Sequence, residues 1–421
     1  MKSTLAGAFQ SLTIRNFRLF AAGQLVSVAG TWMMVVAQDW LVLSLTGDSA
    51  SALGMVTALQ FAPLLLFTLY AGGLADRYDK RRLLMGANLV SGALAVLLAV
   101  LVLAGGVRLW HVCLFALGLG VVNAVEVPAR MSFVSELVGA RLLPNASALS
   151  AAYFSSARVV GPALAGLLIS RFGTGWVMLL NAASYLATVV ALWMVRPGEL
   201  HRSDRRPERA RVRDGIRYLV ARPGLILPMV LAGVVGMLGF NFQLTLPLLA
   251  KTVFHADAAA FGLLTAALAA GSLVAAFATT MRRARPALGL VTAAAAGFGT
   301  LEILSGLAPT YTTTALLLFF TGIGSIYFAQ AANHRIQLGT DPDYRGRVLA
   351  LYTLVFQGTT PLGALIIGGV SGHLGARAGL ILGGAASVLA AAAVWGAGRR
   401  RTTDPAATPA GGRQPRGAER T

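Results

Sequence analysis

Charged residues and cysteines are scarce in this sequence, and each scarcity excludes a class of protein. Only 12% of the 421 residues are Asp, Glu, Lys or Arg, against about a quarter in a soluble domain, so too little charge is present to cover a soluble surface. The single cysteine, Cys113, excludes an internal disulfide framework and a cysteine-rich zinc or iron–sulfur site. Because 56% of the residues are hydrophobic, most of these side chains must face lipid.

Sequence motifs for nucleotide hydrolysis and for common catalytic sites are also missing. The chain has only three lysines, Lys2, Lys80 and Lys251, and no G-x-x-x-x-G-K-[ST] loop. It has no G-x-S-x-G elbow, no H-x-x-E-H zinc motif and no cluster of Cys and His. We therefore expect neither an enzyme, nor a metal site, nor a cofactor, and we expect that this polypeptide does not hydrolyse ATP.

Twelve apolar runs are long enough to cross a bilayer. A membrane-spanning helix needs about 20 apolar residues, and runs of that length, bounded by charge, Gly or Pro, recur along the whole chain. The runs centre on residues 18–45, 52–75, 83–106, 109–129, 146–170, 174–195, 225–250, 258–280, 287–307, 311–333, 347–372 and 378–397. This pattern predicts an all-α polytopic membrane protein with twelve transmembrane helices.

Lysine and arginine are distributed unevenly over the connectors between these runs. The termini and the connectors near residues 76–82, 130–141, 196–222, 282–285 and 335–347 hold 30 of the 35. The opposite side holds Arg108, Arg171, Lys251 and Arg377, and Arg158 lies inside a run. Because cytoplasmic loops carry the excess of positive residues, we expect a multi-pass protein of the cytoplasmic (inner) membrane with both termini cytoplasmic. The net charge of +19 is then a topology signal, and we expect no nucleic-acid partner.

The arginine-rich stretch 196–224 divides the runs into two groups of six. Within it, apolar residues recur at helical spacing and predict a short helix on the membrane surface: Val212, Ile216, Leu219 and Val220. The expected domains are an N-terminal six-helix bundle over 1–195, this cytoplasmic linker, and a C-terminal six-helix bundle over 225–398. The first run lacks the cleavage pattern of a signal peptide, and the tail 399–421 is predicted to be disordered.

The two groups of six resemble each other in sequence. Residues 53–58 resemble residues 261–266 at an offset of 208, residues 118–120 match residues 322–324 at 204, and Pro162 aligns with Pro361 at 199. The last register sets Arg158 against Gln357. Repeated six-helix units are typical of alternating-access carriers, whose binding cavity lies between the halves.

The connector between the second and third runs carries a recognisable motif. Residues 72–82 read G-G-L-A-D-R-Y-D-K-R-R, which resembles the G-x-L-A-D-R-x-G-R-R signature of the major facilitator superfamily, except that Asp79 stands where the signature usually has Gly. The resemblance implies the major facilitator fold and a cytoplasmic latch made by Gly72, Asp76, Arg77, Lys80 and Arg81. It also makes Glu126 or Glu136 a candidate partner for Arg77 or Arg81. A plain basic loop is the alternative, although an aspartate is out of place in one.

The fifth run carries a second resemblance. Residues 157–166 read A-R-V-V-G-P-A-L-A-G and resemble the G-P-x-x-G signature of exporters in the same superfamily, through Gly161, Pro162 and Gly166. Ala157 and Ala165 replace two glycines of that signature. Small residues let a neighbouring helix approach closely and the proline removes one backbone hydrogen bond, so ordinary tight packing is the alternative reading of this motif.

Polar residues inside the runs are the candidates for a substrate cavity. A charge near the bilayer centre costs about 3 kcal/mol, so we expect Arg158 either to act in substrate binding or proton coupling, or to belong to a structural pair. In the first run, Gln24, Ser27, Thr31 and Gln38 fall within about 60° of each other on a helical wheel. This stripe is expected to line the cavity, unless its members only form hydrogen bonds between helices.

Polar residues in the second group and three carboxylates complete the candidate set. The seventh run is interrupted by polar residues and a proline, which predicts a locally broken helix at the cavity: Asn241, Gln243, Thr245 and Pro247. Ordinary polarity at the end of a loop is the alternative. Gln357 is a further candidate, because it is the counterpart of Arg158 in the second half. Asp39, Glu126 and Glu302 are the candidate proton sites. Asp39 lies near the end of a run, so an interfacial position is equally open.

Further resemblance narrows the expected function. Residues 30–33, 40–43, 340–348 and 361–363 are similar to the siderophore-exporter and macrolide-efflux branch of the major facilitator superfamily. This resemblance implies a secondary transporter in the lipid bilayer that exports a small organic molecule, such as a drug, siderophore or secondary metabolite, in exchange for protons. We expect it to be monomeric. An importer or uniporter of the same fold is the alternative, and a membrane receptor or scaffold is the alternative from another class.

Overall fold

Helices are the only regular secondary structure in the part of the chain that is described. The computed structural model covers residues 9–201, 212–279 and 284–402, without the side chains of residues 68–77, 212, 213, 223, 401 and 402. A helix satisfies its backbone hydrogen bonds internally, which a chain surrounded by lipid requires. The all-α fold predicted from the apolar runs is therefore confirmed.

The first half of the chain forms five long helices after a short 3₁₀ turn, η1 (Gln10–Thr13). They are α2 (Arg15–Leu45), α3 (Ala50–Arg77), α4 (Lys80–Leu103), α5 (Leu109–Phe172) and α6 (Thr174–Met194), and the 3₁₀ turn η2 (Pro197–Glu199) follows them. Asp79 is the N-cap of α4, because its Oδ1 accepts a hydrogen bond of 3.1 Å from the backbone N–H of Arg82. The residue that departs from the latch signature thus has a local structural role.

Helix α5 contains two membrane spans. A straight helix of its 64 residues would be about 96 Å long, about three times the thickness of the hydrocarbon core. At Gly139 the backbone leaves the helical conformation, with φ 68° and ψ 173°, a combination that glycine adopts readily. The fourth and fifth predicted spans are therefore the two arms of α5, which meet at Gly139.

The second half is less regular. After the linker helix α7 (Val212–Val220), the seventh span is built from α8 (Pro223–Val234), the π-helical turn η3 (Val235–Gly239), α9 (Phe242–Leu248) and the π-helical turn η4 (Leu249–Val253). The helices α10 (Ala258–Thr279), α11 (Leu288–Leu307) and α12 (Tyr311–Leu338) follow. The eleventh span is divided into α13 (Pro342–Gln357) and α14 (Thr360–Leu374), and α15 (Ala376–Thr402) is the twelfth.

The predicted number of spans agrees with this structure. Within the described residues, 11 helical segments are long and apolar enough to cross a membrane. One of them is Leu109–Phe172, which holds two spans, so the total is twelve. The helices form two six-helix bundles, the architecture of the major facilitator fold.

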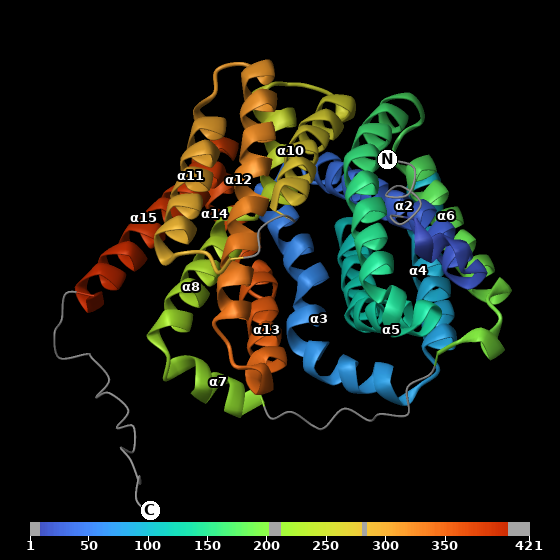
Figure 1. The fold of residues 1–421 in the computed structure, drawn as a ribbon. Coiled ribbons are helices and arrows are strands. Elements are labelled where there is room, and N and C mark those ends of the chain that lie inside the picture. Colours follow the sequence, from blue (N-terminus) through green and yellow to red (C-terminus); the bar gives the residue numbers. More distant parts are fainter. Residues whose placement is uncertain (1–8, 202–211, 280–283, 403–421) are drawn as a thin grey trace, which may run out of the picture.

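The two bundles pack against each other through two helix pairs. Figure 1 shows the later helices α8 and α10–α15 gathered beside the earlier helices α2 and α4–α6, with α3 between the two groups. The most extensive contacts between the halves join α5 with α10 and α3 with α14. Both contacts depend on small residues: a Cβ at Gly166 would lie 2.5 Å from the Ala258 carbonyl oxygen, and one at Gly54 would lie 2.5 Å from that of Ala364.

The two ends of the molecule differ in charge. The arginine-rich end holds the start of α4, the end of α6 and the linker helix α7, and the arginine-poor end holds the turns that join α2 to α3 and α11 to α12. Gly166, Ala258, Gly54 and Ala364 all lie toward the arginine-poor end of their helices. The two halves are therefore in contact chiefly at the arginine-poor end.

The linker and the tail were predicted with different success. A helix does form at the predicted place in the linker, and it packs on α13, because a Cβ at Gly215 would lie 3.0 Å from Arg347 Cβ. Leu219 is buried there, whereas Ile216 and Val220 are 47% and 64% exposed, as a membrane-facing side requires. The tail was predicted to be disordered from residue 399, but α15 continues to Thr402, so the predicted boundary is a few residues too early. Residues 403–421 lie outside the described part.

We predict that a large side chain at Gly262 will separate the halves at the arginine-poor end. A Cβ there would lie 3.1 Å from Gly166 Cα and closer still to the Pro162 carbonyl oxygen. Because backbone cannot move aside as a side chain can, Gly262→Leu should lengthen the distance between the halves by about 2 Å. Double electron–electron resonance between spin labels at residues 171 and 309, in a Cys113→Ser background, measures this distance.

Gly297 offers a matched control for this test. A Cβ at Gly297 would meet no atom within 4 Å, so Gly297→Leu should leave the distance distribution unchanged. An unaltered distribution in folded Gly262→Leu protein would contradict the proposed role of this contact.

Candidate functional site

A cavity of about 560 Å³ lies between the two halves. The first half contributes side chains from α2 to α6, and the second half contributes them from the broken seventh span, α10, α12, α13 and α14. The wall runs from Asp39 and Phe261, nearer the arginine-poor end, to Asn88 and Arg130, nearer the arginine-rich end. A cavity of this size can enclose a drug-sized molecule.

Three of the four polar residues predicted on α2 line this cavity. They are Gln24, Ser27 and Thr31. Gln38, the fourth, is buried behind the wall and donates a hydrogen bond of 3.0 Å from Nε2 to Oε1 of Gln60, which does line the cavity. The expectation for Gln38 is corrected accordingly: it positions a lining residue.

Asp39 lies at the cavity rather than at the membrane interface. Its side chain is 3% exposed and lines the wall on the cavity side of α2, as Phe261 of α10 does. Its Oδ2 is fully buried and has no hydrogen-bond partner among the described residues. The sequence allowed either an interfacial or an intramembrane position for Asp39. In the structure Asp39 lies at the cavity between the halves, which corresponds to the intramembrane position.

Two arginines face the cavity, and their surroundings differ. Arg130 lies 3.7 Å from Glu126 one helical turn away and donates a hydrogen bond of 3.4 Å to Gln24 on α2. Arg158 has no carboxylate within 4 Å among the described residues, and its guanidinium lies 5.3 Å from the ring centre of Trp32. One of the two roles expected for Arg158 was membership of a structural ion pair. The described residues contain no such pair, and Arg158 lines the cavity instead.

The seventh span is broken where its polar residues predict a break. Regular helix stops at the turn η3, and the chain resumes as α9 at Phe242. The Asn241 side chain donates from Nδ2 to the carbonyl oxygens of Met237 and Leu238, at 2.7 and 3.1 Å, which satisfies acceptors that the break leaves open. Asn241 was expected to line the cavity, but its amide is used in this way, and Phe240, Phe242 and Gln243 line the wall instead.

The eleventh span is broken as well, which was not predicted from the sequence. Helix α13 ends at Gln357 and α14 begins at Thr360, with Pro361 in the first turn of α14, where a missing N–H costs least. Gln357, Thr360 and Phe356 line the cavity. Gln357 therefore lies where the alignment with Arg158 places it, at the wall of the cavity.

Glu302 lies outside the cavity, inside the C-terminal bundle. Its side chain is 2% exposed, and its Oε2 has no hydrogen-bond partner among the described residues. Two glycines make room for this carboxyl, because a Cβ at Gly383 would lie 2.7 Å from Oε1 and one at Gly239 would lie 3.3 Å from Oε2. Glu302 thus contacts the π-helical turn η3 that precedes the break in the seventh span.

Only part of the predicted latch can be described. Gly72 belongs to α3, but its surroundings and the side chains of Asp76 and Arg77 lie outside the described part. Lys80 forms an ion pair of 2.5 Å with Glu136. Arg81 donates hydrogen bonds to the carbonyl oxygens of Leu192 and Trp193 at the end of α6, so Glu136 pairs with the lysine rather than with this arginine.

The motif of the fifth span contacts two different helices. A Cβ at Gly161 would lie 2.8 Å from Trp32 Cβ and 3.0 Å from the Ala29 carbonyl oxygen, so Gly161 allows α2 to approach. The carbonyl of the next residue, Pro162, and Gly166 just over one turn later contact α10 of the other half. The motif therefore links the wall of the cavity to the interface between the halves.

An ion pair joins the halves at the arginine-poor end. Lys251 Nζ on η4 lies 2.7 Å from Asp48 Oδ1 in the turn after α2, and 5.2 Å from the ring centre of Trp40. The Trp40 ring stacks on Phe261 of α10, with ring centres 6.4 Å apart. Asp48 holds its position with φ 65°, a left-handed conformation that Asp tolerates better than most residues. In the sequence, Lys251 stood out only as a charge on the arginine-poor side.

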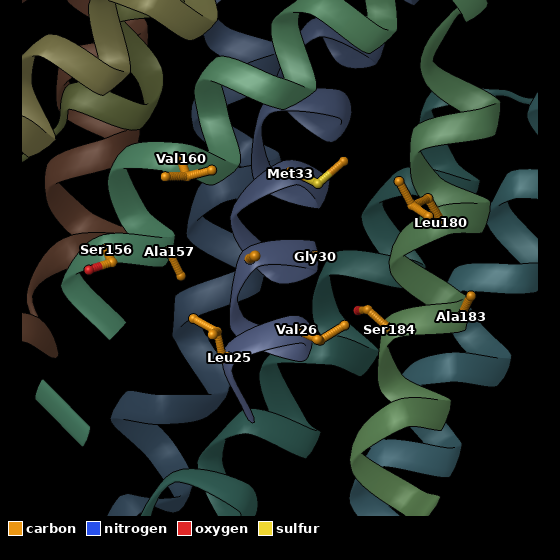
Figure 2. Close-up of a pocket in the computed structure, with 11 residues that line it drawn as sticks. Leu25, Val26, Gly30, Met33, Ser156, Ala157, Val160, Leu180, Ala183 and Ser184 are labelled. Carbon is orange, nitrogen blue, oxygen red and sulfur yellow. The ribbon is translucent and has the colours of Figure 1, made fainter. Parts of the chain in front are cut away.

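A second hollow, of about 510 Å³, lies on the outer face of the N-terminal half. Figure 2 shows its residues on three helices: Leu25, Val26, Gly30 and Met33 on α2, Ser156, Ala157 and Val160 on α5, and Leu180, Ala183 and Ser184 on α6. Leu25, Val26, Val160 and Leu180 are between 45% and 50% exposed. An apolar lining of this kind suits the acyl chains of the bilayer.

Several other polar lining residues were not predicted from the sequence. They include Gln60, Asn88, Ser91, Asn123 and Tyr185. A polar residue in an apolar run was the available signal, but it does not tell which neighbouring helix a side chain faces. Within the described residues, no three His, Cys, Asp or Glu side chains gather as a metal site would need, so the expected lack of a metal site stays a prediction.

The fold and the cavity define a class: a polytopic membrane protein of two six-helix halves with a polar-lined cavity between them, as in alternating-access transporters. Residues 6–411 match the family described as "Transmembrane secretion effector". The chain belongs to this family of the major facilitator superfamily, which is a family of transport proteins rather than enzymes.

Curated relatives have names that agree with this family. The staphyloferrin A transporter of Staphylococcus aureus is 25% identical over 264 residues, which cover 61% of this chain and 65% of that protein. The multidrug efflux pump Tap of Mycolicibacterium fortuitum is 32% identical over 183 residues, covering 42% and 44%. The macrolide efflux protein A of Streptococcus pyogenes is 22% identical over 381 residues, covering 88% and 92%. The first two matches span less than two thirds of those relatives' own length.

Solved structures share the fold. A bacterial homolog of the human lysosomal transporter Spinster, in an inward-facing and occupied conformation, has a TM-score of 0.72 at 16% identity, with 92% of this chain and 97% of that chain covered. A mutant of the nucleoside transporter NupG has a TM-score of 0.70 at 12% identity, with 90% and 98% covered. The predicted major facilitator fold is confirmed by these likenesses.

We predict that removing the ion pair at the arginine-poor end will open that end more often. Lys251→Met keeps the apolar stem of the side chain and removes its charge. Because a partly exposed pair contributes at most about 1 kcal/mol, we expect access to a cysteine placed at the cavity residue Thr265 to rise about twofold to fivefold. The measurement is the alkylation rate with a membrane-impermeant thiol reagent added at the arginine-poor side, in a Cys113→Ser background.

The double variant and a control sharpen this test. Asp48→Asn should have an effect similar to that of Lys251→Met, and combining the two should add little, because both remove the same interaction. Arg108→Met removes a charge from the same end and should leave the rate unchanged. Additive effects of Lys251→Met and Asp48→Asn would show that the pair does not hold this end closed.

Proposed function

We propose that this protein is a secondary transporter that exports a small organic molecule across the cytoplasmic membrane by alternating access, in exchange for protons. The observation that carries the proposal is the cavity between the halves, which is lined from both halves and bounded by contacts at the arginine-poor end. A cavity between two halves that contact each other at one end is the arrangement that alternating access requires. The names of two relatives, a multidrug efflux pump and a macrolide efflux protein, support the direction of transport.

The orientation follows from the charge distribution. The positive-inside rule assigns the arginine-rich end to the cytoplasm, so in this proposal both termini are cytoplasmic and the contacts between the halves lie on the outer side of the membrane. We also propose the division into domains expected from the sequence, with the halves on either side of the linker 196–224. Because one chain contains both halves and the whole cavity, we propose that it works as a monomer in the lipid bilayer.

Two buried carboxyls support coupling to protons. An unpaired carboxylate is costly in an apolar interior, and a bound proton removes that cost. Asp39 lines the cavity, where it can exchange a proton with bulk solvent when the cavity opens. Glu302 contacts η3, next to the break at which the second half can bend. Glu126 is already paired with Arg130, which makes it the weaker of the three candidates.

The test uses inside-out vesicles with an acidic interior and a fluorescent reporter of the pH gradient. Lipophilic cations, macrolides and siderophores are added in turn, and a transported compound should dissipate the gradient. We expect Asp39→Asn and Arg158→Ala to abolish this response at equal expression, whereas Glu199→Gln, a substitution at an exposed surface carboxyl, should leave it intact. If a compound is transported without any proton movement, the proposed exchange for protons is wrong, and the protein is instead a uniporter or an importer.

The latch is proposed on the resemblance of residues 72–82 to the superfamily signature. In that arrangement Asp76 helps to hold the halves together at the cytoplasmic end when the cavity faces outward. Asp76→Asn should therefore slow turnover several-fold and leave membrane insertion intact, which initial rates of substrate efflux at matched protein levels will measure. Rates equal to those of the wild type would remove Asp76 from the transport cycle.

A further inference from the structure

We propose that the cavity binds organic anions, and that the guanidinium of Arg158 holds the carboxylate of an amphipathic or aromatic substrate. The inference rests on the proposed transport function and narrows it to a substrate class. It is carried by a cation that lines the cavity without a counter-charge, beside aromatic rings that suit the apolar body of such a molecule.

The charge of Arg158 is uncompensated in the described structure. No carboxylate of the described residues lies within 4 Å of its guanidinium. A cation in the membrane interior is costly without a partner, and such a residue normally faces a partner or a water-filled cavity. Here the cavity is where a partner can arrive, because Arg158 is part of its wall.

The other charges of the cavity are arranged so that they do not neutralise Arg158. Glu126 lies 3.7 Å from Arg130 and so has a cation of its own. Asp39 is seven residues from Trp32 along α2, which corresponds to about 10 Å along the helix axis, whereas Arg158 lies over Trp32 itself. The region around Trp32 therefore carries a net positive charge.

The residues around Trp32 also hold the Arg158 guanidinium in a position suited to binding a carboxylate. Trp32 packs edge-on against Phe154 with ring centres 6.2 Å apart, and Gly161 lets the Trp32 Cβ approach α5 closely. A guanidinium held over an aromatic face keeps its N–H groups free to form two parallel hydrogen bonds to a carboxylate. Arg158 can thus bind a carboxylate without first releasing another partner.

The opposite wall supplies an apolar surface. Phe240 and Phe242 from the broken seventh span and Phe356 from α13 line the cavity, and the Phe240 ring lies 4.9 Å from that of Phe356. Aromatic walls favour flat or apolar bodies. The ligand class that fits both walls is a carboxylate attached to an aromatic or amphipathic body.

The test measures binding of matched ligands to purified protein in nanodiscs. The probes are 1-naphthylacetate and 4-biphenylacetate, each with its neutral carboxamide and with the corresponding primary ammonium compound. Dissociation constants come from the ligand-dependent rise in melting temperature at low salt. We expect each carboxylate to bind about tenfold more tightly than its carboxamide, and the ammonium compounds to bind most weakly.

Two substitutions at Arg158 assign the preference to this residue. In Arg158→Gln the preference for carboxylate over carboxamide should fall below about twofold, and Arg158→Lys should keep an intermediate preference because its single ammonium cannot form the paired hydrogen bonds. Arg171→Gln, at the exposed end of the same helix, is the matched control and should keep the full preference.

The outcomes separate this inference from the transport function. Equal or tighter binding of the neutral or cationic probes by the wild type, no binding of either carboxylate, or a preference that survives in Arg158→Gln would each overturn the inference. Gradient-dependent export of cations or neutral compounds alone would leave the transport function standing while the inference fails. Anion binding that depends on Arg158, in a protein that moves no compound in vesicles, would support the anion site and contradict the transport function.

Discussion

Charge in the membrane interior is tolerated only where it has a partner or an aqueous surface, and most of the described structure follows this constraint. The positively charged residues gather at one end, and Asp39, Glu126, Arg130 and Arg158 line the cavity. Glu302, buried in the C-terminal bundle without a partner for its Oε2 among the described residues, is the exception, and a bound proton would remove its charge. Arg130 pairs with Glu126 and donates a hydrogen bond to Gln24. Arg158 lies at the cavity over an aromatic ring. The position of the cavity is thus tied to the few charges that the spans contain.

The same constraint explains why the irregular backbone is concentrated beside the cavity. A helix break in lipid leaves carbonyl groups without donors, so breaks occur where other groups can satisfy them. In the seventh span the Asn241 amide bonds two such carbonyls. In the eleventh span the break between Gln357 and Thr360 borders the cavity. The C-terminal half therefore has two helix breaks that border the cavity, whereas the N-terminal half contributes mainly continuous helices.

Much of the fold could be predicted from the sequence, because hydrophobic length and arginine distribution are strong, local signals. The twelve spans and the broken seventh helix follow from runs and interruptions that can be read directly along the chain. Which side chains meet across helices is not local information. The wheel angles that grouped Gln38 with Gln24 could not show that Gln60 would cover Gln38, nor that the cavity would extend around α2 to Asp39.

The contacts between the halves are made largely of backbone and small residues, as at Gly54, Gly166 and Gly262. The carbonyl groups at these contacts already belong to intact helices. Parting these surfaces therefore leaves no backbone hydrogen bond unmade, which helps the two conformations of a rocking molecule to lie close in free energy. A small input, such as one bound molecule or one transferred proton, is then enough to decide which of them is populated.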